Sequence, residues 1–154
     1  MLDTKIPLIA EFLKDHQQFS RLLSEIDRLL AVEKYELARQ RASELNALAG
    51  PHIAYEETEL YPRLAALGEH NVSQQLLVEQ HHDALDAVRL LISKHNLTPL
   101  QVKAIRSGIK LGLNHAEHCG SLISLMAQLS EEDQAKSLTQ LYRLRYEGKL
   151  WTEL

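Results

Sequence analysis

A histidine and a glutamate lie one helical turn apart in the segment PHIAYEETELYPRL, residues 51–64. On an α-helix, residues i and i+4 share a face, so His52 and Glu56 would project to the same side. Leu60 and Leu64 continue that side at helical spacing, which predicts that it faces the core. An imidazole and a carboxylate are costly inside a core unless they are paired, and together they are typical ligands of a metal ion.

Three more histidines lie on apolar stripes of other segments with helical periodicity, namely His16, His81 and His115. One such histidine is more often an ordinary core residue than a ligand. Four of them without partners would cost about 1–3 kcal/mol each, which a domain with about 5–15 kcal/mol of net stability could not carry. We therefore expect the four imidazoles to share metal ions, with Glu56 as a carboxylate that bridges two of them.

The rest of the chain predicts the helices that would position these side chains. Good helix formers dominate, and apolar residues recur at three-to-four spacing over about residues 7–30, 34–67, 73–94, 99–129 and 131–147. Gly50 and Pro51 predict a kink or short break directly before His52. Short connections favour antiparallel neighbours, so we predict one all-α domain over residues 1–154. It would be an up-down-up-down four-helix bundle over about 7–129 with a short fifth C-terminal helix.

In such a bundle the four histidines would lie at one level. They fall alternately early and late in the four long segments, and each residue of a helix rises about 1.5 Å along its axis. Unrelated core histidines would have no reason to coincide in this way.

Composition excludes several other classes of protein. The net charge is −4, which provides no basic surface for nucleic acid. An uninterrupted apolar run of membrane-spanning length and a basic, apolar leader are both absent, so no membrane partner is expected. One cysteine, Cys119, excludes an intrachain disulfide and is typical of a reducing compartment, so we expect a cytoplasmic location.

The order of these residues resembles the hemerythrin-like (HHE cation-binding) family. The shared pattern is a histidine on the first helix, His-x-x-x-Glu followed by LYPRL on the second, Glu-x-His on the third and a histidine on the fourth. The resemblance covers about residues 8–128, and HIAYEETELYPRL is its most specific part. It implies a centre of two iron ions, oxo- or hydroxo-bridged, held by His16, His52, His81 and His115 with Glu56 as the bridge. Zinc or manganese are alternatives.

The sequence allows more than one assignment at three places in this site. His81 continues the apolar stripe of its helix and His82 does not, so His81 is the expected ligand. The family has a carboxylate four or five residues after the last histidine, whereas this chain has Cys119 and Gly120 there. Either Cys119 as a thiolate or His118 could replace it, or the centre could use water or a small anion instead. Cys119 could equally be a small core residue. Tyr55 is predicted to face the site, where its phenol could contact a bound molecule, or else to be a core tyrosine.

Three functions follow as hypotheses. The first is a small di-iron protein that binds, senses or scavenges dioxygen, nitric oxide or peroxide. The second is an enzyme that turns over peroxide or nitric oxide, or that oxidises iron, because fewer carboxylates would leave more open coordination. The third is a bundle with an altered site that holds zinc, one metal or none and acts as an interaction module with an unknown protein partner.

Overall fold

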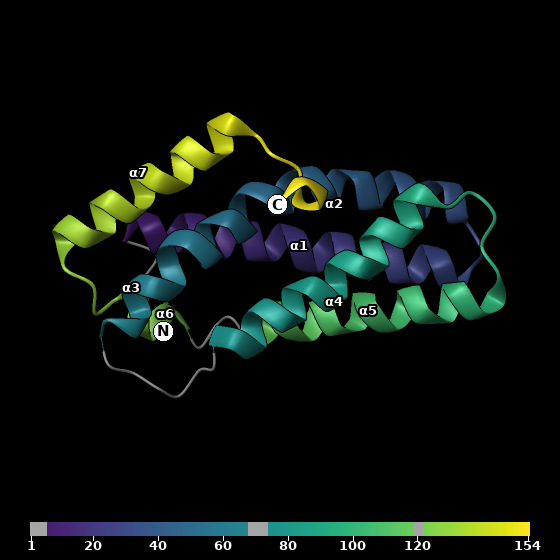
Figure 1. The fold of residues 1–154 in the computed structure, drawn as a ribbon, viewed down its shortest axis with the longest axis horizontal. Helices are drawn as coiled ribbons and strands as arrows, with labels where there is room; N and C mark the ends of the chain where they lie inside the picture. Colours follow the sequence, from purple (N-terminus) through teal and green to yellow (C-terminus); the bar gives the residue numbers. More distant parts are fainter. Residues whose placement is uncertain (1–5, 68–73, 119–121) are drawn as a thin grey trace.

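The computed structural model describes residues 6–67, 74–118 and 122–154, and within these residues the chain is helical and has no strand. Four long helices lie side by side (Figure 1): α1 Pro7–Ala31, α2 Tyr35–Tyr55, α4 Gln74–Ser93 and α5 Pro99–His118. Helix α1 packs against α2 and α5, and α4 packs against α5 and α2. The all-α class predicted from the sequence is therefore confirmed. In the described part of the chain, none of the helices has the length and apolarity needed to cross a membrane.

The second predicted helix is continuous at the position where a break was expected. Helix α2 passes through Gly50 and Pro51, and the departure from α geometry comes later. A π-helical turn occupies Glu56–Leu60, and the short helix α3 follows over Tyr61–Ala65. The glycine serves packing instead, since a Cβ on Gly50 would overlap the backbone carbonyl oxygen of Lys149. The expected short break before His52 was wrong, because α2 continues through Pro51, and Gly50 allows close approach of the C-terminal tail.

The C-terminal helix α7, Glu131–Glu147, has the predicted bounds. Ser130 begins it, because its hydroxyl accepts a hydrogen bond from the Asp133 N–H at 3.1 Å, and Gly148 ends it with a φ of +64°. The tail then forms a short 3₁₀ turn, η3 Trp151–Glu153, in which Trp151 is buried. The tail is fixed to the middle of α2, because Asn46 and Thr152 exchange two hydrogen bonds of 3.1 and 3.0 Å.

The predicted fourth helix corresponds to two described helices, α5 and α6. Helix α6 covers Leu122–Met126, and residues 119–121 between the two lie outside the described residues.

The core consists of two apolar clusters with a polar layer between them. One cluster joins the middle and end of α1 to α2, α4, α5 and Trp151, and it includes Phe19. The other joins the beginning of α1 to the π turn, α3, α6 and α7, and it includes Phe12. His16 lies between these two phenylalanines, with ring-centroid distances of 4.2 Å to Phe12 and 5.8 Å to Phe19. The layer that contains His16 is the candidate functional site.

Candidate metal centre

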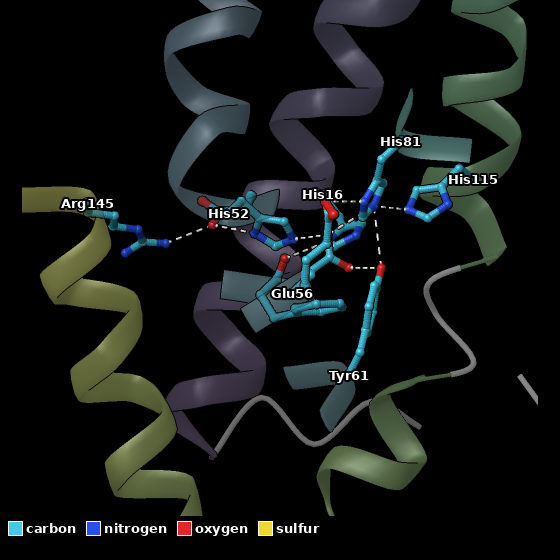
Figure 2. Close-up of polar contacts among 10 residues, drawn as sticks. His16, His52, Glu56, Tyr61, His81, His115 and Arg145 are labelled. Carbon is cyan, nitrogen blue, oxygen red and sulfur yellow. Dashed lines mark hydrogen bonds and ion pairs between the residues drawn. The ribbon is translucent and has the colours of Figure 1, made fainter. Parts of the chain in front are cut away.

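Five buried side chains from the four long helices and the π turn converge in this layer (Figure 2): His16, His52, Glu56, His81 and His115. They form two groups that could each hold a metal ion, and within each group the donor atoms lie within 4.8 Å of one another. The first group is His16, His52 and Glu56, and the second is Glu56, His81 and His115. We call them the His16–His52 group and the His81–His115 group. Glu56 belongs to both, so a single carboxylate lies between two clusters of imidazole nitrogens.

All four imidazoles point the same ring nitrogen, Nε2, towards the centre of the cluster. Each Nδ1 atom contacts an oxygen outside the cluster, which leaves Nε2 for the centre. The four oxygens are Phe12 O at 2.9 Å from His16, Asp15 Oδ2 at 2.8 Å from His52, Glu57 Oε2 at 3.2 Å from His81 and Gln80 Oε1 at 2.8 Å from His115. Metal-binding histidines characteristically donate their other ring N–H to a carbonyl or a carboxylate, which fixes the tautomer and the ring orientation. The four imidazoles therefore have the outer hydrogen bonds that metal-binding histidines typically make.

The Nε2 atoms that face the centre are arranged in a way that suits a bound cation. His52 Nε2 is buried and forms an ion-pair contact of 3.1 Å with Glu56 Oε1, so a positive charge at this position is stabilised by the carboxylate. His81 Nε2 and His115 Nε2 lie 2.9 Å apart. With both Nδ1 atoms donating outward, two lone pairs would face each other at this distance, which is unfavourable unless a proton or a metal ion lies between them. A buried set of imidazole nitrogens with one carboxylate suits iron, manganese or zinc.

Tyr61 is the phenol at this site. Its hydroxyl donates to Glu56 Oε2 at 2.9 Å and lies 3.4 Å from His81 Nε2 (Figure 2). Glu56 and Tyr61 are five residues apart, and the i→i+5 geometry of the π turn brings them to one face. Tyr55, which was predicted to face the site, instead contacts Ser137 of α7 through its hydroxyl at 2.6 Å. Of the two interpretations of Tyr55, the structure agrees with the core tyrosine, since it is fully buried in an apolar cluster, and the phenol beside the candidate donors is Tyr61.

A series of hydrogen-bonded charged side chains, which was not predicted from the sequence, connects the centre to α7. Asp15 Oδ2 accepts hydrogen bonds from His52 Nδ1 at 2.8 Å and from Arg145 Nη2 at 2.9 Å (Figure 2). The same guanidinium binds Glu11 Oε2 through Nη1 at 2.7 Å. Asp15 and Arg145 are 130 residues apart, so no local spacing could have indicated this contact. Glu57 is a second acid near the centre that the sequence does not single out, because nothing in its local spacing distinguishes it from an acid on the solvated face of a helix.

Two predicted ligands cannot be placed. His118 is the last residue of α5 and its side chain is not described, and Cys119 lies outside the described residues. The part of the chain that the structure describes therefore leaves open what replaces the missing carboxylate.

A small pocket of about 40 Å³ adjoins the centre. His16, Glu56, His81 and His115 border it, and its other walls are mainly apolar side chains, including Phe19 and Trp151. One water molecule needs about 10–15 Å³ measured in this way, so the pocket has room for a molecule of a few atoms. The candidate donors are thus exposed to a small, mostly apolar volume.

Burial and neighbouring charges shift the pKa values of the candidate donors in opposite directions. Burial, together with the charge of a neighbouring histidine, lowers the pKa of His16 and of His115 to about 4. Burial disfavours the charged form of His52 too, but Glu56 and Asp15 outweigh this effect and raise the pKa of His52 to about 9. Burial would raise the pKa of Glu56, yet the charge and hydrogen bond of His52 hold it below its ordinary value. Without metal, one proton is thus held mainly between His52 and its two carboxylates.

The metal-free protein should be most stable near pH 6.5–7 and lose stability on both sides. His52 has a higher pKa when folded, so its contribution is present below about pH 6.5 and is lost as the pH rises towards 9. His16 and His115 have lower pKa values when folded, so stability falls as the pH decreases from about 6.5 to 4. Urea unfolding in a chelator at pH 5, 7 and 9 measures both effects. A free energy of unfolding that stays constant between pH 7 and 9 would contradict the assignment of His52.

Comparisons with protein-family models, with curated proteins and with solved structures found no match to this chain. A functional assignment therefore rests on the chemistry of the two residue groups that share Glu56.

Proposed function

We propose that this chain is a hemerythrin-like protein in which an up-down-up-down bundle holds two non-haem iron ions bridged by Glu56. The observation that supports the proposal best is the division of five buried donors into two groups with one shared carboxylate. Each group combines two imidazoles with that carboxylate, which is the donor set typical of non-haem Fe(II) with open coordination positions. The outward hydrogen bond of every Nδ1 supports the same proposal.

The small-molecule ligand would be dioxygen, nitric oxide or peroxide. Bound iron would supply electrons to such a molecule. The chain itself would supply the apolar pocket of about 40 Å³, which limits the size of the ligand and the access of water. Tyr61 would provide a hydroxyl beside the shared carboxylate, held there by its hydrogen bond to Glu56.

A second candidate is an enzyme that consumes peroxide or nitric oxide. The observation that favours it is the Tyr61 hydroxyl, a protic group 3.4 Å from His81 Nε2 and next to the pocket-lining Glu56. Stopped-flow spectra of the reduced iron protein distinguish the two candidates. An adduct that forms with dioxygen and disappears when gas is removed supports reversible binding, whereas rapid return to the ferric state with product formation supports turnover.

Neighbouring histidines in α4 provide a matched test of the metal centre. His81 is buried in the His81–His115 group, whereas His82 is exposed. We expect wild-type protein produced with ample iron to contain two metal ions per chain, His81→Ala to lose one of them, and His82→Ala to keep both. Elemental analysis with an optical spectrum measures the number and the identity of the metals.

Other metal contents would contradict different parts of the proposal. Wild-type protein without metal would contradict the proposed centre and favour an interaction module. Two zinc or manganese ions would contradict iron but keep the dinuclear site. Equal loss in both variants would show that the effect of His81→Ala is not specific to the site.

A further inference from the structure

Helix α7 reaches the candidate centre through one cationic side chain. Arg145 binds Glu11 with one guanidinium nitrogen and Asp15 with the other, at 2.7 and 2.9 Å, and these two acids lie one turn apart on α1. The Asp15 oxygen that accepts from Arg145 is the same Oδ2 that accepts from His52 Nδ1. Arg145 therefore holds the atom that orients one of the candidate ligands.

We propose that Arg145 is a positioning residue through which helix α7 controls metal binding at the His16–His52 group alone. The inference rests on the proposed metal-binding function and goes beyond it, because it assigns a role to the C-terminal helix. In the described residues, the Arg145 side chain contacts no member of the His81–His115 group, whose outer oxygens come from Glu57 and Gln80 instead. The two halves of the centre are therefore supported by different parts of the chain.

Arg145 should affect metal affinity mainly by orienting His52 through Asp15, and less through its own positive charge. The Arg145 side chain is 30% exposed, so water and salt screen its repulsion of a bound cation. The Asp15 side chain is 11% exposed, and without Arg145 its carboxylate can turn towards solvent and release His52 Nδ1. The imidazole would then lose the hydrogen bond that fixes its ring plane, and outer contacts of this kind affect metal affinity by about 10–100-fold.

A second link between α7 and the same region supports this role. Ser137 contacts the hydroxyl of Tyr55, which directly precedes Glu56 in the chain, at 2.6 Å. Helix α7 is thus attached both to Asp15 on α1 and to Tyr55 at the end of α2. The second contact fixes the position of α7, and the first is the one that reaches a single half of the centre, through His52.

The test uses cobalt(II), whose visible absorption reports its ligand set, added to metal-free full-length protein. His81→Ala is expected to leave only the His16–His52 group intact, and His16→Ala only the His81–His115 group. In the His81→Ala background we expect Arg145→Gln to weaken cobalt binding about tenfold. In the His16→Ala background we expect Arg145→Gln to change the affinity less than twofold.

Two further variants separate positioning from general effects on α7. Arg143 lies on the same helix and pairs with Glu147 on the exposed surface at 2.7 Å, so Arg143→Gln removes the same charge without touching Asp15. It should leave both cobalt affinities unchanged. Arg145→Lys keeps the charge but loses the two-pronged contact, so it should restore only part of the affinity. Urea unfolding of the metal-free variants measures any general destabilisation separately.

The outcomes are distinct. Selective weakening at the His16–His52 group, with partial rescue by lysine, would support the inference. Unchanged binding, or equal weakening in both backgrounds, would overturn it while leaving the metal centre intact. A wild-type protein that binds no cobalt would overturn the proposed function itself, and this inference with it.

Discussion

Replacing Glu56 with glutamine should strongly weaken metal binding at both halves of the centre at once. Glu56 is the only residue shared by the two candidate groups, and a neutral amide cannot bridge two cations as a carboxylate does. Glutamine keeps the shape of the side chain and can still accept the hydrogen bond from Tyr61, so the fold should survive. We expect affinity for both metal ions to fall by more than about a hundredfold, because changes to outer contacts alone cost about 10–100-fold.

The matched control is Glu59→Gln in the same π turn. The Glu59 side chain is 24% exposed and lies near Arg63 at 3.7 Å, so it belongs to neither group. Competition with a chromophoric chelator gives both affinities and the number of ions bound. If Glu56→Gln still binds one ion with wild-type affinity, the carboxylate is not shared and the dinuclear proposal is wrong.

Replacing Gly50 with alanine should cost about 2–4 kcal/mol of stability. The added Cβ would overlap backbone atoms of Lys149 and Leu150, and backbone cannot move aside as a flexible side chain can. Overpacking of this kind costs about 1–3 kcal/mol, and displacement of the tail would also expose part of the buried Trp151. Urea unfolding of the metal-free protein measures the loss.

The same substitution in a shortened chain reverses the expected sign. Without residues 149–154 the obstacle is gone, and alanine is a better helix former than glycine by about 1 kcal/mol. Gly50→Ala should then stabilise the shortened protein relative to its own parent. A cost that persists without the tail would place the strain within α2 rather than at the contact with Lys149.

The buried cluster of candidate donors was predictable from the sequence because helical periodicity reports which residues share a face. The stripes of α1, α4 and α5 place His16, His81 and His115 among apolar neighbours, and the structure buries all three. The same reasoning distinguishes His81 from the exposed His82. The same spacing is less accurate elsewhere in α2. Leu48, four residues before His52, would belong to the inner stripe but is 36% exposed, whereas Ala49 is buried.

Tyr61 was missed for a specific physical reason. A constant period of 3.6 residues turns Tyr61 away from Glu56. The π turn at Glu56–Leu60 changes that period locally and brings Tyr61 to the site. Such a turn depends on tertiary packing and has no simple signal in one sequence. The contacts of Asp15 with His52 and Arg145 were missed for a related reason, since they join residues far apart in the chain.

The polar layer between the two apolar clusters has a mechanical consequence. Each cluster provides cohesion to its own end of the molecule, while the middle depends on whatever satisfies the imidazoles and Glu56. A pair of ions would act there as a crosslink that ties four long helices together at one height. Loss of the ions would remove that crosslink, and the polar layer would then be less stable than the apolar cluster at either end. Occupancy of the centre would therefore set how rigidly the two ends of the bundle move as one body.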